Sequence, residues 1–199
     1  MADDKKSVAI VAMGKSSGAY VIDVAANLGR PVADEVWAIN AMGGAIKSDR
    51  IIVMDNLDVL GEPYSWIKEY EGRVISAHSN VAMREVEPYP LEEVLNYVRF
   101  PYFNTTVAYA LGLAIYEQVG EIKLYGADFT YPDRHVSEAG RGCAEFWVAQ
   151  AMLRGIAVTL PKSTTLIDVR QGTPLYNYNH VNVEHVDGRF KITEKSGEV

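Results

Sequence analysis

Short apolar runs recur through the first 160 residues of the chain and alternate with longer amphipathic segments. The runs are rich in β-branched residues and carry few polar side chains, a pattern typical of strands that are buried on both faces of a parallel sheet. Turn-forming or polar residues follow most of them, which is how strands of this kind end. The runs cover residues 7–13, 35–40, 50–55, 73–78, 122–125 and 156–160.

The segments between these runs have helical spacing. After the first run, Val21, Val24, Ala25 and Leu28 fall on one helix face, and Gly29 then ends the pattern. Strands that alternate with helices of this length indicate βαβ units. We therefore predict an α/β fold, Rossmann-like and doubly wound, with a mainly parallel sheet. The other predicted helices cover residues 57–70, 91–98, 107–119 and 138–154, of which the first is interrupted by Gly61 and Pro63.

The C-terminal tail has a different pattern. Residues 180–186 and 189–194 alternate between apolar and polar side chains around Asp187-Gly188, a dipeptide that favours a type I′ turn. This pattern predicts a β-hairpin with little core of its own. We divide the chain into a nucleotide-binding domain, 1–170, and a C-terminal extension, 171–199, that packs on the main domain or on a partner subunit. The aromatic residues of the tail fit a docked hairpin or a homo-oligomer: Tyr176, Tyr178 and Phe190.

Composition narrows the classes of protein. The chain has 199 residues, 48% of them hydrophobic, which is enough for one core. Its net charge of -7, without a basic cluster longer than Lys5-Lys6, argues against binding to duplex nucleic acid. The single cysteine, Cys143, excludes an internal disulfide and fits a reducing cytosol. No apolar run approaches 18 residues, so we expect neither a membrane span nor a secretion signal, and a cytoplasmic location.

A glycine-containing loop follows the first predicted strand. Gly14, Lys15, Ser16 and Ser17 suggest a P-loop, but that motif requires a glycine where Ala9 stands, and G-x-G-x-x-G is also absent. The backbone amides and hydroxyls of this loop nevertheless face a helix start, where anions bind. We predict a ligand-binding loop, with a plain N-capped turn as the alternative.

Other polar residues stand at predicted strand ends or helix starts. Asn40, Asp55 and His78 close three consecutive strands, and Asn104 with Thr105 begins a helix. In a parallel sheet the carboxyl ends of the strands share one edge, where ligands bind. Helix capping explains the same residues equally well. We keep Asn40, Asp55, Asn104 and Thr105 as candidate ligand-binding residues and interpret His78 as structural.

The stretch with the most candidate catalytic and binding side chains follows the predicted strand at residues 122–125. Asp128, just past the strand end, suits a ribose hydroxyl, a divalent ion or the orientation of a base. His135 suits a general acid or base near neutral pH, while Tyr131 and Arg134 suit a phosphate or leaving group. The alternative is that Asp128 caps the next segment and that Arg134 and His135 are solvated. No C-x-x-C or H-E-x-x-H spacing predicts a transition-metal site, so Mg²⁺ is the one cofactor that we retain.

Several of these segments resemble a known family. Residues 10–17 (Ile-Val-Ala-Met-Gly-Lys-Ser-Ser), 37–40, 51–55 and 104–128, the last ending in Leu-Tyr-Gly-Ala-Asp, resemble the motility accessory factor and 6-hydroxymethylpterin diphosphokinase-like family. Bacterial sialyltransferases of the Cst type, which use a CMP-activated sugar, have a similar Gly-Ile-Asp segment and a downstream histidine base. The resemblance spans roughly residues 7 to 160, and small proteins of this kind also occur in phage genomes. It implies a Rossmann-like nucleotide-binding fold and transfer of either a sugar or a diphosphate.

Three hypotheses follow. The first is a cytoplasmic transferase, in the host cytoplasm if phage-encoded, that takes a nucleotide-activated sugar and uses His135 as its base. The second is a non-catalytic protein that sequesters a nucleotide-derived ligand. The third is an ATP-dependent diphosphokinase, which requires Mg²⁺. All three place a nucleotide or nucleotide sugar at the carboxyl edge of the sheet.

Overall fold

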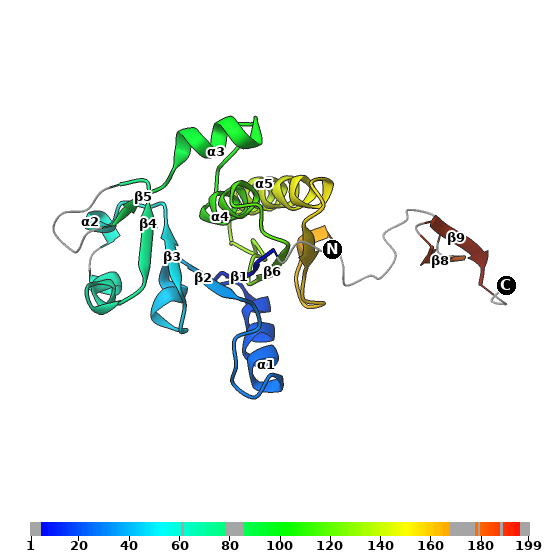
Figure 1. The fold of residues 1–199 in the computed structure, drawn as a ribbon, viewed down its shortest axis with the longest axis horizontal. Coiled ribbons are helices and arrows are strands. Elements are labelled where there is room, and N and C mark those ends of the chain that lie inside the picture. The colour runs from blue at the N-terminus through cyan, green and yellow to red at the C-terminus, as the bar shows by residue number, and fades with distance from the viewer. Residues whose placement is uncertain are drawn as a thin grey trace.

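The computed structural model describes residues 5–60, 62–78, 86–167, 178, 180–187 and 189–195. Within them a seven-stranded sheet has the order β5-β4-β3-β2-β1-β6-β7 (Figure 1), and all of its neighbouring strands run parallel. The α/β prediction is thus confirmed. The strands are β1 Ser7–Val11, β2 Glu35–Ile39, β3 Arg50–Val53, β4 Arg73–Ser76, β5 Glu87–Pro88, β6 Glu121–Tyr125 and β7 Ala157–Thr159.

The order of the strands reverses at β1. From β1 the chain proceeds to β5 along one half of the sheet and then returns to place β6 against the free side of β1. Helices α4 and α5 lie on one face of the sheet and α1 on the other (Figure 1). The helices are α1 Gly18–Ala26, α2 Leu57–Leu60, α3 Leu91–Val98, α4 Thr106–Tyr116 and α5 Arg134–Leu153, with 3-10 segments η1 Lys15–Ser17, η2 Asn40–Gly44 and η3 Glu62–Glu69.

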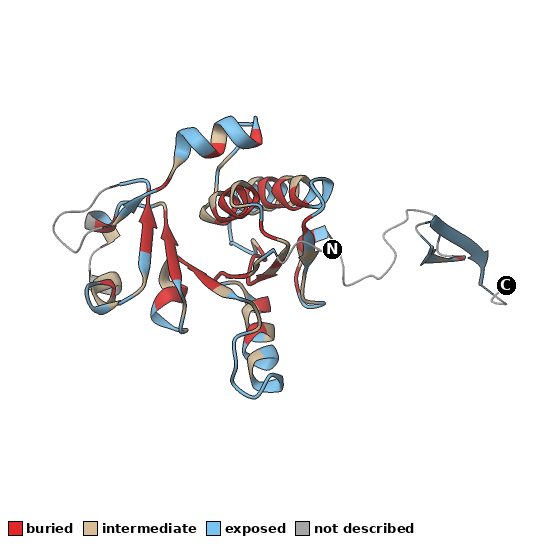
Figure 2. Cartoon of the chain, in the orientation of Figure 1, coloured by how far each residue is buried: buried red, intermediate tan, exposed pale blue. Residues whose placement is uncertain are grey.

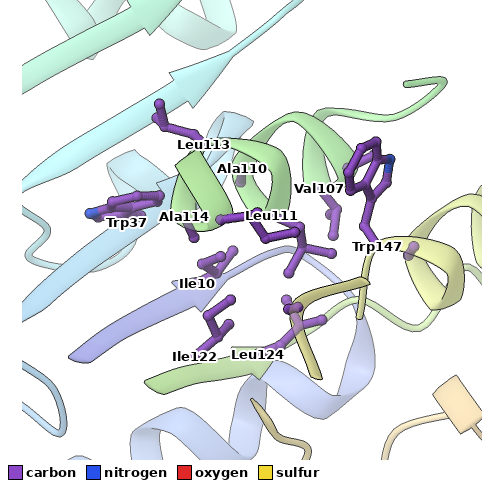
Figure 3. Close-up of a cluster of buried hydrophobic side chains, with 14 of the residues drawn as sticks. Ile10, Trp37, Val107, Ala110, Leu111, Leu113, Ala114, Ile122, Leu124 and Trp147 are labelled. Atoms are coloured by element: carbon purple, nitrogen blue, oxygen red, sulfur yellow. The ribbon is translucent and has the colours of Figure 1, made fainter. Parts of the chain in front are cut away.

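The alternation along β1 separates two cores. Ile10 packs with α4 and α5, while Val11 faces the side of α1. Figure 3 shows Ile10 with Ile122 of β6 below Leu111 of α4, and Trp147 of α5 beside them. Because β1 is buried on both faces, it forms a rigid centre from which the loops at its carboxyl end extend.

Helix α5 differs from its predicted range. It begins at Arg134, four residues before the predicted start, because the Asp133 carboxylate caps it by accepting from Val136 N at 3.1 Å. Arg134 and His135 therefore lie in the first helical turn and not in a loop. The predicted helix 57–70 is divided into α2 and η3, as its glycine and proline suggest. The two-residue β5 was not predicted, because it ends in Pro88, and proline fits only an edge strand.

The predicted C-terminal hairpin is present. β8 Val181–Val186 pairs antiparallel with β9 Arg189–Glu194, and Asp187 has the left-handed φ of 51° that a type I′ turn requires. β9 is exposed along its whole length (Figure 2). The predicted boundary between residues 170 and 171, and Tyr176, lie outside the described residues. Within the described part of the chain, no helix has the length and apolar character needed to cross a membrane.

An ion network closes the amino edge of the sheet. Lys6 Nζ lies 2.9 Å from Glu35 Oε1 and 3.0 Å from Glu117 Oε2, and the Arg50 guanidinium pairs with the same two carboxylates. Arg50 also lies 4.7 Å from the ring centroid of Trp37. Burial alone would raise the pKa of Glu35, but hydrogen bonds from Trp37 and Lys6, together with Arg50, lower that pKa to about 2. Two cations and two anions thus neutralise one another where the strands begin.

Candidate functional site at the carboxyl edge of the sheet

A cavity of about 700 Å³ opens at the opposite edge, where β1, β2 and β6 end. This is the topological switch point, at which open α/β sheets bind ligands. The wall combines segments that are distant in sequence: residues 12–15, 39–40, 104–107 and 126–131, with His135, Val136, Ala139 and Gly140 of α5. Eight predicted site residues are brought together there: Gly14, Lys15, Asn40, Asn104, Thr105, Asp128, Tyr131 and His135.

Asp128 is the most constrained residue of the cavity wall. Its side chain accepts from Ser16 N through Oδ2 at 2.7 Å, and the residue is only 3% exposed. Its other oxygen, Oδ1, is buried and has no hydrogen-bond partner among the described residues. The Thr165 hydroxyl holds the Asp128 backbone carbonyl, which fixes the residue in place. A buried acceptor without a partner costs free energy, which a ligand hydroxyl or amine would recover.

Two glycines permit the close contact between the β1 and β6 loops. Gly14 N donates to Gly126 O at 2.7 Å, and a Cβ on Gly14 would lie 2.5 Å from both Gly126 O and Asp128 Oδ2. Gly126 has a φ of 69°, and a Cβ there would lie 2.0 Å from Ala12 O. Ser16 is buried between the loops, where its Oγ accepts from Gly126 N at 2.9 Å. Ser16 thus joins the two loops and does not line the cavity; nor does Ser17.

Asn40 presents a second buried acceptor without a partner. It follows β2 with a left-handed φ of 52°, and its Oδ1 has no hydrogen-bond partner among the described residues. Its Nδ2 donates to Asp55 Oδ2 at 3.4 Å. Asp55 is exposed and does not line the cavity, so the structure connects it to the site only through Asn40.

The start of α4 forms another part of the wall. Thr105 caps the helix by accepting from Ala108 N at 3.1 Å, as its sequence position suggests. Asn104 Nδ2 donates to the carbonyl of Ala139 in α5 at 3.2 Å, which ties the two helices together. The positive end of the α4 dipole therefore faces the cavity and favours an anion there.

The loop after β6 is held by a serine that the sequence did not single out. Ser137 Oγ accepts from Tyr131 N at 2.8 Å and donates to Tyr131 O at 3.1 Å, so Tyr131 is fixed at the cavity mouth. His135 is exposed and lines the same mouth. Arg134 does not line the cavity: its side chain is 89% exposed and donates to Glu138 at 2.6 Å.

The apolar part of the wall was not predicted. Phe129 has a left-handed φ of 49°, and a Cβ on Gly140 would lie 2.6 Å from its ring. Neither the backbone conformation of Phe129 nor its contact with a helix eleven residues on has a local sequence signal. Met13, Ile39, Val136 and Ala139 complete this part of the wall.

Three further titratable residues lie away from the cavity. His78 is exposed beyond β4, Arg141 donates to Glu145 at 2.9 Å, and Cys143 is buried in the core, where burial raises the pKa of its thiol. Within the described residues no group of three His, Cys, Asp or Glu side chains is arranged to hold a metal ion. Among the described residues that line the cavity, Asp128 is the one carboxylate.

The fold is similar to that of known sialyltransferases. No family model matches the chain, and no curated protein does so either. The sialyltransferase CstII from Campylobacter jejuni, in complex with the substrate analogue CMP-3FNeuAc, is 16% identical, with a TM-score of 0.56 over 97% of this chain and 92% of that one. CST-II in complex with a trisaccharide acceptor and CMP is 14% identical, with a TM-score of 0.55 over 98% and 93%. At these identities the likeness establishes the α/β fold.

Proposed function

We propose that the chain is a nucleotide-binding transferase of the glycosyltransferase type, which takes a nucleotide-activated sugar as its donor. The observation that carries the proposal is the buried Asp128 Oδ1, an acceptor without a partner among the described residues, on the wall of a cavity at the switch point of the sheet. A volume of about 700 Å³ suits a ligand of this size. The fold supports the choice, since CstII has been solved with CMP and with a CMP-sugar analogue.

The chemistry of the wall suggests how the donor lies. Asp128 Oδ1 and Asn40 Oδ1 both accept hydrogen bonds, so they suit the hydroxyls of a ribose or sugar, or the amine of a base. The phosphate suits the opposite set of groups, which consists of the loop at Gly14, the Lys15 ammonium and the start of α4. The hydroxyl donors of the ligand thus meet acceptor oxygens, and its phosphate oxygens meet hydrogen-bond donors and positive charge.

In the proposed transfer, His135 removes the proton of the acceptor hydroxyl. The hydroxyl oxygen then forms a bond to the anomeric carbon of the sugar, and the bond from that carbon to the phosphate oxygen breaks. The nucleotide leaves with the electron pair, and His135 passes its proton to solvent. Tyr131 and Lys15 stabilise the leaving phosphate from the cavity mouth.

Donor binding is testable without knowing the acceptor. The measurement is thermal unfolding of the full chain against CMP, UDP, GDP, ATP with Mg²⁺, and their sugar conjugates. A ligand at about 100 times its Kd adds about 2.7 kcal/mol of stability. Asp128→Asn retains an oxygen that accepts from Ser16 N and places the amide NH₂ group, a donor, where Oδ1 lies. We therefore expect this variant to fold and to lose the ligand-induced rise in unfolding temperature. The proposal fails if no nucleotide stabilises the wild-type chain.

Catalysis is tested separately from binding. His135→Ala should lower sugar transfer by about 10²–10⁴-fold and leave the donor's thermal shift unchanged. His78→Ala is the matched control, because His78 is also exposed but does not line the cavity. Equal activity of both variants would remove His135 from the mechanism.

A second candidate function is non-catalytic binding of a nucleotide-derived ligand. It is favoured by the exposed position of His135, whose imidazole has no hydrogen-bonding partner among the described residues to orient it. A wild-type chain that binds a nucleotide sugar tightly, and releases it unchanged after prolonged incubation with acceptors, would support this function. The diphosphokinase alternative predicts ATP consumption that a chelator abolishes.

A further inference from the structure

The segment that follows β7 reaches back to the cavity wall. It begins with a turn in which Thr164 N donates to Pro161 O at 3.0 Å. The next residue, Thr165, donates its hydroxyl hydrogen to the backbone carbonyl of Asp128, 37 positions earlier in the chain. Thr165 is partly buried and does not line the cavity. Any influence of this hydroxyl on the cavity must therefore pass through Asp128.

The neighbours of Thr165 hold it in place. Thr164 is 1% exposed, and its Oγ1 accepts from Leu166 N at 3.3 Å. Leu166 is fully buried in the core that includes α4 and α5. Ile167 N donates to Glu145 Oε1 of α5 at 2.7 Å. Because the residues on both sides are fixed on the core, the Thr165 hydroxyl is presented to the cavity wall with little further loss of conformational entropy.

The carbonyl that Thr165 holds belongs to the peptide group between Asp128 and Phe129. Phe129 has a φ of 49°, a left-handed conformation that is rare for a bulky residue. Such a conformation persists only where surrounding contacts maintain it. The ring of Phe129 packs so closely on Gly140 that a Cβ there would lie 2.6 Å from it, and the Thr165 bond fixes the plane of the preceding peptide. Two tertiary contacts thus hold this stretch of backbone.

This peptide group orients two different parts of the cavity wall. Asp128 supplies Oδ1, the buried acceptor without a partner among the described residues, and Phe129 supplies apolar surface. A rotation of the peptide would move both side chains, because they are attached at its two ends. It would also disturb the bond from Ser16 N to Asp128 Oδ2, which measures 2.7 Å. The position of the acceptor therefore depends on contacts at both the side chain and the carbonyl of Asp128.

We propose that Thr165 is a positioning residue of the ligand site, whose hydroxyl holds the Asp128–Phe129 peptide so that Asp128 Oδ1 faces the ligand. The site then extends beyond the β1 and β6 loops to the segment after β7. This inference rests on the proposed function in one respect: it takes Asp128 Oδ1 as the acceptor of a hydrogen bond from a nucleotide or nucleotide sugar. A purely structural Thr165 would stabilise the fold without changing ligand affinity.

The first test is the affinity of the full chain for the nucleotide that stabilises it among CMP, UDP, GDP and ATP with Mg²⁺, measured by calorimetry. Thr165→Val removes the hydroxyl and keeps the branched shape, and Kd should rise at least about tenfold. Thr165→Ala removes the same hydroxyl and serves if the valine variant does not fold. Thr165→Ser retains the hydroxyl and should restore the affinity.

Thr159→Val is the matched control for the loss of a threonine hydroxyl. Thr159 Oγ1 donates to Glu121 Oε1 at 3.3 Å, and Thr159 does not line the cavity. Its replacement should therefore leave Kd unchanged. Wild-type affinity in Thr165→Val, or an equal loss in Thr159→Val, overturns the proposal.

A double-mutant cycle with Asp128→Asn shows whether Thr165 acts through Asp128. The asparagine variant already lacks the acceptor at the Oδ1 position, so a further change of Thr165 to valine should alter Kd by less than about twofold. Ligand is added at concentrations that saturate the weakened variants. If the two residues acted independently, their separate losses of affinity would multiply, and that result overturns the positioning role.

Hydrogen exchange of single backbone amides tests the geometry without a ligand. In Thr165→Val the Ser16 amide, which donates to Asp128 Oδ2, should exchange at least about tenfold faster. The Ala12 amide, which donates to Tyr125 O at 2.9 Å between the ends of β1 and β6, is the internal control and should not change. Unchanged exchange at Ser16, or faster exchange of both amides, overturns the inference. If no nucleotide binds the wild-type chain, the proposed function fails, and this measurement still decides whether Thr165 positions Asp128.

Discussion

The two edges of the sheet use carboxylates in opposite ways. At the amino edge, Glu35 receives hydrogen bonds from Lys6, Trp37 and Arg50, and its pKa is lowered to about 2. At the carboxyl edge, the Asp128 carboxylate accepts one hydrogen bond, from the backbone amide of Ser16. Its second oxygen has no partner among the described residues. The first arrangement stabilises the folded chain by itself. The second leaves binding capacity that only another molecule can use.

This difference distinguishes a carboxylate that stabilises the fold from one that is available to a ligand more clearly than the residue type does. Both carboxylates lie at strand termini within a few residues of a glycine or a turn, and nothing in their identity distinguishes them. What distinguishes them is the number of donors that reach them. Substitutions of the charged groups at the amino edge should therefore change stability and leave ligand binding intact, and substitutions of the unpartnered acceptors Asp128 and Asn40 at the carboxyl edge should do the reverse.

The largest expected loss of stability comes from Arg50→Met. Arg50 is nearly buried, and its removal leaves Glu35 and Glu117 with Lys6 as their shared cation. We expect the free energy of unfolding in urea to fall by about 3 kcal/mol. Arg73→Met is the control, because its ion pair with Glu87 is exposed and should cost less than about 1 kcal/mol. Equal losses in the two variants would contradict the role given to burial.

Gly14→Ala should lower the free energy of unfolding by about 1–3 kcal/mol, because the added methyl group is overpacked against Gly126 O and the Asp128 carboxylate. Since Asp128 must move, nucleotide binding should weaken as well, and both effects are measured by thermal unfolding with and without ligand. Gly18→Ala is the matched control: a Cβ there meets nothing within 4 Å, so stability should hold or rise by up to about 1 kcal/mol. A Gly14→Ala variant that binds ligand normally would contradict the close contact described between Gly14 and Asp128.

Acid should weaken the amino edge through Glu35. Because its folded pKa is lowered from 4.5 to about 2, its stabilisation is fully present above pH 4.5 and disappears as the pH falls through 2. The full shift corresponds to about 3 kcal/mol, which solvent screening of this partly exposed group reduces to roughly 1–2 kcal/mol. In Glu35→Gln this part of the pH dependence should be missing when unfolding is followed from pH 7 to pH 2. Parallel curves for both chains would contradict it.

The smallest change in stability is expected for Asn40→Gly, within about 0.5 kcal/mol. Glycine relieves the left-handed φ of 52° but adds freedom to the unfolded chain. Donor affinity should nevertheless fall tenfold or more, because the Oδ1 acceptor is lost. Gln118→Gly controls for the backbone effect, since Gln118 has a φ of 54° and lies outside the cavity. Unchanged affinity in Asn40→Gly would remove Asn40 from the site.

The fold and part of the site follow from local sequence signals. The apolar runs and the hairpin dipeptide located the strands, and the shared edge of parallel strands brought Asn40, Asn104 and Asp128 together. The buried position of Ser16 was not predicted, because a serine in a loop gives no sign that its hydroxyl will accept a hydrogen bond from a glycine 110 positions away. Arg134 fell outside the predicted helix 138–154 because the capping carboxylate of Asp133 was not recognised. Phe129 and Ser137 act through tertiary contacts that no local pattern encodes.

The pairing of β1 with β6 has a consequence for how the protein is made. These strands join residues 7–11 to residues 121–125, so the centre of the sheet is a contact of high sequence separation. Ser16 and Asp128 can meet only after well over half of the chain has left the ribosome, which at about 5–20 residues per second takes several seconds. Until then β1 can pair with β2 alone, so the edge of β1 that faces β6 stays unpaired. Binding competence thus arises late in synthesis, in the same event that shields β1 from aggregation.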